Sequence, residues 1–322
     1  MLTDASVRTP KLAMEHNTYA TSTYIAAPIA DVAAYLKVGT SLNEYTLFSR
    51  MREQVDDTTW LGTASGYQAG LYYHVRHRNL DHIQIVEWHC GKDYGHYYHV
   101  YPMLLFTPAY FGSRDTGTYY HWISFVDPAR ATPMITQGLP TVHRAESHSL
   151  KAQLERRAGY RRAVRGELEL RSHTVYVDAP VGPARAYLAD PANAAEWGYL
   201  LRRDDARLFD EYDHPVEIRI AVRDLGDYQM IEHDTHYLET GAVVRAPLVI
   251  VPAAFAFAQP AATGFILHRI TAWPVAGERA VGKASPDDYD TEAINAKRII
   301  EARAGNLDAY ARGTSYQPPR AV

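Results

Sequence analysis

Apolar and polar positions change from strand-like to helical spacing at two matched places in this chain. Residues 18–26 and 174–178 are predicted to be strands, and each runs into an Ala-Pro pair. Proline ends a strand because it cannot donate to a ladder and restricts the residue before it. Residues 29–36 and 181–188 follow, with apolar positions such as Val32 and Leu36 at helical spacing. The pattern therefore predicts two strand–helix openings.

Each opening is followed by a run of strands and then by one long helix. Short helical turns are expected around Glu44 and Trp197. Gly and Asp separate the extended segments, which cover 59–63, 70–76, 82–90, 96–105, 118–126 and 265–273. The long helices are predicted over 143–158 and 291–312. The second carries an apolar stripe of Ile294, Ile299, Ala302, Leu307 and Tyr310.

The two openings belong to one long internal repeat. Residues 24–29 return as 176–181 with a shift of 152, and Thr116-Gly117 with His121 returns as Thr263-Gly264 with His268 with a shift of 147. A repeat of this length indicates two whole domains of one fold, predicted over 16–160 and 170–315. The fold class is α+β. In each domain a curved antiparallel sheet wraps on a long C-terminal helix, with two short helices after the first strand.

Composition narrows the function. The net charge is −4 with acids and bases interspersed, which disfavours a nucleic-acid or anionic-membrane partner. The single cysteine, Cys90, excludes a disulfide framework within the chain. No apolar stretch of transmembrane length and no signal peptide are recognised, so we expect a cytoplasmic protein. The 24 Tyr and 15 His against 8 Phe indicate either a polar-lined cavity or half-exposed strands.

At this point the sequence resembles a known group. The stretches Ile-x-Ala-Pro-x-x-x-Val-x-x-Tyr-Leu at 25–36 and Val-x-Ala-Pro-x-x-x-Ala-x-x-Tyr-Leu at 177–188, with the element order, resemble the START-like helix-grip (SRPBCC) superfamily. The tandem arrangement resembles the didomain aromatase/cyclases of bacterial polyketide pathways. That resemblance implies cyclisation or dehydration of a poly-β-ketone chain, with polyketide synthase components as partners. It supplies no universal catalytic motif, and the fold also serves binding proteins.

Strand alternation selects the candidate catalytic residues. In 118–126, Tyr119, His121 and Phe125 share the more apolar face, and His268 holds the matching position in the second copy. We predict that this face lines the pocket, with His121, His268 and Tyr119 as proton-transfer groups. The alternative is that the imidazoles are core histidines that pack the fold.

The strand over 82–90 adds further candidates. Trp88 is predicted to line the first pocket and His233 the second, as a catalytic group. Glu87 and His89 would then face solvent; with the faces reversed they would form an acid–base pair. Cys90, beside Trp88, is interpreted as a small buried hydrophobe.

Further polar aromatic residues gather in the first copy. Tyr73, His77 and Tyr98, with Trp88 and Phe125, are predicted to bind substrate. The second copy has fewer polar residues that could line a cavity, so the first copy is expected to be the active one. The pairs His74/His77, His96/His99 and His143/His148 have spacings that zinc could use. Within each of the first two pairs, the two histidines would point to opposite faces of a regular strand and could not bind the same ion. We therefore expect no metal, and no other cofactor is expected either.

The sequence thus predicts a cofactor-free cyclase or dehydratase, of lyase or isomerase type, for a polyketide-like or other apolar biosynthetic intermediate. Shaping the chain in a pocket would bring the reacting carbons together. One alternative is a binding or transfer protein for a hydrophobic metabolite or lipid. Another is a structural protein whose repeat forms an assembly interface. Oligomerisation is compatible with all three.

Overall fold

The structure is a computed structural model that describes residues 17–64, 68–198, 201–205, 207–275 and 286–306. The first domain contains one antiparallel sheet with the strand order β1-β7-β6-β5-β4-β3-β2. Its strands are β1 (Thr18–Ile25), β2 (Arg50–Asp56), β3 (Thr59–Ala64), β4 (Gln68–Leu80), β5 (Ile83–Gly91), β6 (His99–Phe106) and β7 (Thr118–Val126). Its helices are α1 (Ile29–Leu36), α2 (Leu42–Tyr45) and α3 (Pro133–Arg157), with short 3-10 turns at Gly39–Ser41, Pro108–Phe111 and Pro128–Arg130.

The second domain repeats this plan. Its sheet has the order β8-β15-β14-β12-β11-β10-β9, and β13 pairs with β12 beside that path. The strands are β8 (Leu168–Val177), β9 (Leu201–Asp204), β10 (Arg207–Asp210), β11 (Pro215–Asp224), β12 (Gln229–Tyr237), β13 (Val243–Arg245), β14 (Leu248–Pro252) and β15 (Phe265–Pro274). The helices are α4 (Val181–Leu188), α5 (Ala194–Trp197), α6 (Ala253–Ala256) and α7 (Pro286–Arg303), with a 3-10 turn at Pro191–Asn193. The prediction of two tandem helix-grip domains is confirmed.

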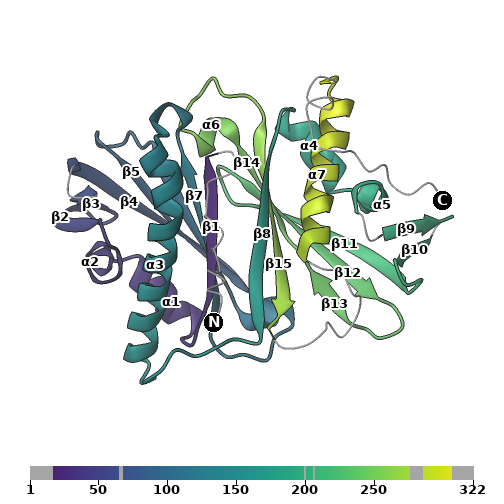
Figure 1. The fold of residues 1–322 in the computed structure, drawn as a ribbon, viewed down its shortest axis with the longest axis horizontal. Coiled ribbons are helices and arrows are strands. Elements are labelled where there is room, and N and C mark those ends of the chain that lie inside the picture. The colour runs from purple at the N-terminus through teal and green to yellow at the C-terminus, as the bar shows by residue number, and fades with distance from the viewer. Residues whose placement is uncertain (1–16, 65–67, 199–200, 206, 276–285, 307–322) are drawn as a thin grey trace, which may run out of the picture.

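The two sheets stand between the two long helices. Helix α3 lies across one sheet and α7 across the other, and strands β1 and β8 lie side by side in the middle (Figure 1). One apolar cluster fills the space between the first sheet and α3, and another lies between the second sheet and α7. A third joins residues of both sheets, such as Ile85 and Phe125 from one and Met230 and Ile270 from the other. Central strands such as β5 and β7 are therefore buried on both faces, and only one of these faces looks towards the helix.

The repeated Thr-Gly pair marks a close approach of the chain. A side-chain carbon on Gly117 would lie 2.2 Å from the carbonyl oxygen of Ile25, and one on Gly264 would lie 2.4 Å from that of Val177. Gly264 also has a φ of 74°, in the left-handed region that favours glycine. Because these glycines have no side chain, the start of the last strand can lie close to the end of the first strand in each domain.

Repeated ion pairs on the long helices hold the ends of the first strands. Glu155 accepts a hydrogen bond from the Ala26 amide at 3.0 Å, and Glu301 accepts one from the Asp178 amide at 2.8 Å. Lys151 pairs with Glu155 one helical turn away, and Lys297 pairs with Glu301 in the same way. These contacts dock α3 and α7 in matching positions.

The predicted long helices needed correction. Helix α3 begins at Pro133, ten residues before the predicted start, and Thr132 caps it by accepting from the Ile135 amide at 3.3 Å. Gly138 and Pro140, which usually interrupt helices, lie inside it. Helix α7 begins at Pro286 and ends at Arg303, so Leu307 and Tyr310 of the predicted stripe fall outside the described residues.

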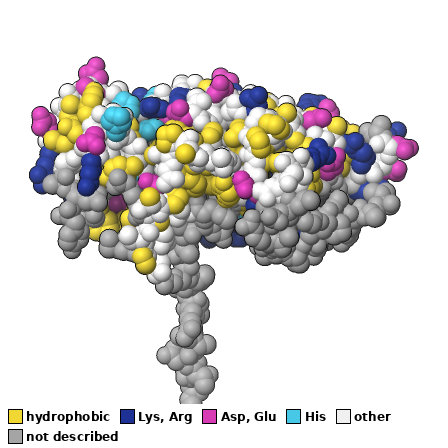
Figure 2. Space-filling view, turned by 90° about the horizontal axis from the view of Figure 1, so that it is seen from above, with side chains coloured by type: hydrophobic (Ala, Val, Ile, Leu, Met, Phe, Trp, Pro, Cys, Tyr) yellow, Lys and Arg dark blue, Asp and Glu magenta, His cyan; other side chains and the backbone are white. Residues whose placement is uncertain are grey.

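On the face seen from above, apolar side chains are interspersed with Lys, Arg, Asp and Glu (Figure 2). None of the helices in the described ranges has the length and apolar character needed to cross a membrane.

Candidate functional site

A cavity of about 350 Å³ lies between the sheet of the first domain and α3. That volume is at the lower end of the range for small-molecule sites. Its walls are mainly apolar and aromatic, with a few polar groups among them. The lining residues are Leu42, Tyr45, Thr46, Phe48, Ser49, Ala64, Leu71, Tyr73, Trp88, Cys90, His99, Tyr101, Met103, Trp122, Ile135, Gly138, Leu139, Val142, His143 and Glu146.

Glu146 is the acidic residue of this wall. It lies on α3 with only 4% of its surface exposed, and its Oε1 accepts a hydrogen bond from the Leu47 amide at 2.7 Å. Burial raises the pKa of the Glu146 carboxyl to about 7, although the amides of Leu47 and Phe48 and the charge of Arg50 act in the opposite direction. A carboxyl group with this pKa holds a proton near neutral pH and can give it away, as a general acid must.

His143 lies one helical turn before Glu146, on the same side of α3. Its Nδ1 is 2.8 Å from the Ser124 hydroxyl, and its ring stacks on Trp122 with centroids 4.2 Å apart. Burial, helped by nearby His99, lowers the pKa of His143 to about 3. At neutral pH the imidazole is therefore neutral, and a large fraction of the neighbouring Glu146 carboxyl is protonated.

The second domain has an acid at the matching place but surrounds it differently. Glu292 on α7 corresponds to Glu146 and forms a buried ion pair with Arg269 at 2.7 Å. Arg269 occupies the β15 position that matches Trp122 on β7, and its guanidinium lies over the Trp197 ring at 5.2 Å. The same helix position thus carries an ion-paired carboxylate in one domain and a carboxyl of raised pKa in the other.

Two of the predicted substrate-binding residues line the cavity. Trp88 borders it while its Nε1 donates to the Leu36 carbonyl at 3.1 Å. Tyr73 also borders it, and its hydroxyl donates to the Thr63 carbonyl at 3.1 Å. Tyr98 packs against the core of the first domain without lining the cavity. His77 is exposed and lies 3.0 Å from Gln84 Oε1, near the far end of β4.

The predicted orientation of His121 and His268 is wrong. Both imidazoles are fully buried between the two sheets, with their Nε2 atoms 2.8 Å apart. The Ser22 and Thr174 hydroxyls each lie 2.7 Å from the Nδ1 of the nearer ring. Burial lowers the pKa of His121 to about 3 and that of His268 well below its ordinary value. The pair joins the domains and does not reach the cavity.

Phe125 and Tyr119 share that face of β7 and are likewise not in the cavity. Phe125 packs between the sheets. The Tyr119 hydroxyl donates to Asp115 at 2.5 Å and accepts from the Leu168 amide at 2.9 Å. The more apolar face of β7 packs on the other sheet, whereas Tyr120 and Trp122 point towards α3. Greater apolarity did not identify the pocket face, because both faces are buried.

His233 does lie inside the second domain. It is 3% exposed and its ring is 5.1 Å from that of Trp197. Burial lowers the pKa of His233 to about 3, and the charge of Arg269 adds to the effect. It shares this interior with the Arg269–Glu292 ion pair.

Glu87 and His89 were predicted to face solvent, and this prediction is wrong. They are 1% and 3% exposed and lie at the junction of the two domains. Arg78 pairs with Glu87 at 3.1 Å, and the His89 ring meets Phe255 of α6 at 6.1 Å. Hydrogen bonds from His89 and Tyr228 are among the contacts that hold the pKa of Glu87 below its ordinary value despite burial.

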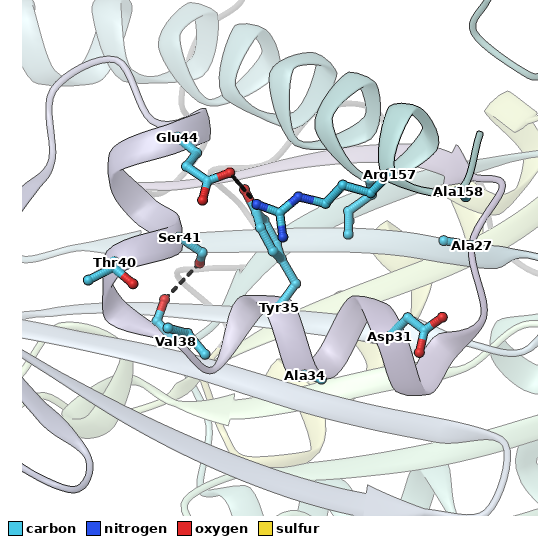
Figure 3. A pocket seen from close by; sticks show the side chains of 11 residues that line it. Ala27, Asp31, Ala34, Tyr35, Val38, Thr40, Ser41, Glu44, Arg157 and Ala158 are labelled. Atoms are coloured by element: carbon cyan, nitrogen blue, oxygen red, sulfur yellow. Dashed lines mark hydrogen bonds and ion pairs between the residues drawn. The ribbon is translucent and has the colours of Figure 1, made fainter. Parts of the chain in front are cut away.

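A second hollow of about 560 Å³ opens between α1, α2 and the end of α3. There Arg157 pairs with Glu44 at 2.6 Å and lies over the Tyr35 ring at 4.7 Å (Figure 3). Arg303, Glu196 and Tyr187 repeat the arrangement in the second domain. Because both domains have it, we interpret this cluster as a clamp between helices.

The sequence reasoning missed Glu146 and treated His143 only as half of a metal pair with His148. On α3, His148 is exposed while His143 is buried. In the described part of the chain, no group of three His, Cys, Asp or Glu could hold a metal ion. The available signal was the repeat itself, which places Glu146 and Glu292 at equivalent positions of two long helices.

Fold and site together define a tandem helix-grip protein with an acid-bearing cavity in its first domain. A family model described as a domain of unknown function (DUF8713) matches residues 14–163 and again 170–309, so the chain belongs to this family. No curated protein matches the sequence.

Several solved structures are similar over most of their length. The di-domain ARO/CYC BexL from the BE-7585A biosynthetic pathway has 14% identity and a TM-score of 0.32, and the match covers 94% of this chain and 100% of BexL. The di-domain ARO/CYC StfQ from the steffimycin biosynthetic pathway has 12% identity and a TM-score of 0.27, covering 89% and 99%. A START superfamily protein from Mycobacterium smegmatis has 6% identity and a TM-score of 0.30, covering 43% of this chain and 97% of its own.

Proposed function

We propose that the first domain binds a small, largely apolar oxygenated molecule in its cavity and promotes cyclisation or dehydration, with Glu146 as the proton donor. One observation carries this proposal. The carboxyl group of Glu146 lines an apolar cavity, and burial raises its pKa to about 7. A proton held at that pKa is available to a leaving hydroxyl or a forming alkoxide at neutral pH.

The arrangement fits a catalyst better than a carrier. A pocket that only binds an apolar molecule gains nothing from a buried carboxyl, because burying such a group costs free energy. Strongly shifted pKa values inside a cavity are typical of functional sites. The counterpart Glu292 is neutralised by Arg269 at 2.7 Å. The proposed activity therefore belongs to the first domain.

A small β-hydroxy ketone makes the proposal testable. 3-Hydroxy-1-tetralone is a bicyclic compound of a size suited to the cavity, and it becomes 1-naphthol when it loses one water. The C2–H bond next to the carbonyl and the C3–O bond break, a C=C bond forms between C2 and C3, and the hydroxyl leaves as water with the proton of Glu146. The resulting unsaturated ketone then transfers a proton from C4 to its oxygen, which completes the aromatic ring of 1-naphthol. The carboxylate then recovers the proton released from carbon, so nothing is oxidised or reduced.

The experiment measures 1-naphthol formation by fluorescence with the full chain, Glu146→Gln and the surface control Glu44→Gln. We expect Glu146→Gln to lower the rate by about 10²–10⁴ and Glu44→Gln to leave it unchanged. Binding of the compound without any product would support the carrier alternative. Equal rates for Glu146→Gln and the unaltered chain would refute the role of this carboxyl.

A further inference from the structure

The neutral imidazole of His143 has a defined orientation in the cavity wall. Its Nδ1 is 2.8 Å from the Ser124 hydroxyl, which comes from the interior face of β7. The flat contact with Trp122, at 4.2 Å and 22°, restricts rotation of the ring. Two neighbours from two strand positions thus fix which ring nitrogen faces Ser124.

The tautomer follows from counting donors and acceptors. Ser124 is 1% exposed, so its hydroxyl proton needs a protein acceptor. The only side-chain partner recorded for it in the described ranges is His143 Nδ1. If the hydroxyl donates to Nδ1, that nitrogen is unprotonated and the imidazole proton sits on Nε2. We assign this tautomer because the reverse one would leave the hydroxyl proton of Ser124 without an acceptor.

Nε2 is therefore a donor on a residue that lines the cavity. His143 and Glu146 stand one turn apart on α3 and border the same space. The lining residues named above include no Lys or Arg among the described side chains, and Arg50 is turned away to the carbonyls of Thr46 and Ser49. The site thus offers hydrogen-bond donors without offering a positive charge.

We propose that His143 is a further catalytic residue, whose Nε2–H donates to the carbonyl oxygen of an uncharged ketone substrate. This inference rests on the proposed function and names the substrate class for the same cavity. The imidazole polarises the carbonyl and stabilises the oxygen as it becomes an enolate, while Glu146 protonates the departing hydroxyl. An uncharged ketone fits this wall better than a carboxylate does, because the lining side chains include no Lys or Arg that could pair with an anion.

The experiment uses two bicyclic probes of matched shape, 1-tetralone and tetralin, with quenching of tryptophan fluorescence as the readout. Trp88 and Trp122 border the cavity and report occupancy. We expect His143→Phe to weaken 1-tetralone by about tenfold, since one hydrogen bond is lost, and to change tetralin by less than about threefold. Ser124→Ala should weaken 1-tetralone by a smaller factor, because it frees the ring to adopt the other tautomer.

A spectroscopic readout separates hydrogen bonding from packing. The infrared carbonyl stretch of bound 1-tetralone should lie at lower wavenumber in the unaltered chain than in His143→Phe. Equal losses for both probes, or an unshifted carbonyl stretch, would overturn the role of His143 while the cavity function stands. If neither probe binds the unaltered chain, the proposed function fails, and this inference fails with it.

Discussion

The histidine pair between the domains makes the fold sensitive to acid. His121 and His268 are fully buried and share one short Nε2–Nε2 contact of 2.8 Å. A single proton can lie between the two nitrogens. A second proton there would bring two N–H groups face to face in a site that excludes water. The surrounding groups are the Ser22 and Thr174 hydroxyls and His173, which pairs with Asp290 at 3.4 Å.

The sign of the effect follows from the direction of the pKa shifts. Burial lowers the pKa of His121 from 6.5 to about 3, and that of His268 falls well below 6.5. Below pH 6.5 these two imidazoles bind protons in the unfolded chain but stay unprotonated in the folded chain. The free energy of unfolding therefore falls as the pH falls through 6.5. From pH 8 to pH 5 each such imidazole costs about 2 kcal/mol, and the pair costs about 4 kcal/mol.

The perturbation is the double variant His121→Leu/His268→Leu, which replaces the pair by apolar groups of similar size. Urea denaturation at pH 8 and pH 5 gives the free energy of unfolding of each form. The double variant should lose about 4 kcal/mol less than the unaltered chain over this interval. Glu146, whose raised pKa of about 7 acts in the opposite sense, is present in both forms and cancels. His82→Gln, which removes an exposed imidazole, is the control.

An equal loss of stability in the double variant and the unaltered chain would refute the reasoning. It would mean that the two imidazoles are protonated in the folded state at pH 5, and the 2.8 Å contact could not then be a hydrogen bond between neutral rings.

Three further predictions concern single side chains. Turnover should fall as the pH rises through about 7, because Glu146 then loses its proton, and Glu146→Gln should remove that dependence from the pH–rate profile. Arg269→Leu removes the cation that pairs with buried Glu292, so urea denaturation should show that the free energy of unfolding falls by about 3–5 kcal/mol. The double variant Arg269→Leu/Glu292→Leu should recover this loss. A loss below about 1 kcal/mol in the single variant would contradict a buried ion pair. Gly117→Ala places a carbon 2.2 Å from the Ile25 carbonyl oxygen and should lower the thermal midpoint by a destabilisation of about 1–3 kcal/mol; an unchanged midpoint would show that the strand end yields freely.

Residues that end strands and helices made the order of the elements predictable. The helices over 29–36 and 181–188 and the strand over 118–126 occur with the predicted bounds. The Ala-Pro and Thr-Gly pairs impose chain geometry whatever the rest of the fold does. The start of α3 was not predictable in this way, because packing against the sheet overrides the local cost of Gly138 and Pro140.

The faces of the strands could not be assigned from alternation alone. Alternation with a period of two separates Trp122 from His121, but it does not say which of two buried faces meets the helix. The apolar face of β7 was needed for packing sheet on sheet, and the face towards α3 could carry polar aromatic residues around a cavity. Trp88 was placed correctly in the cavity wall because the neighbouring positions on that face of β5 are also apolar.

The different interiors of the two domains follow from few positions. At the site of Trp122, Arg269 sends a cation across the interior to the carboxylate at the site of Glu146. Such a pair costs desolvation on both sides and is favourable only while both charges remain together. The pair therefore ties the Glu292 carboxylate to a guanidinium. An aromatic ring at the same strand position leaves the carboxyl of Glu146 without a buried cation, and burial then raises its pKa to about 7. In a duplicated fold, the exchange of Trp122 for Arg269 at one strand position can thus decide whether the buried acid of the facing helix is ion-paired or has a raised pKa.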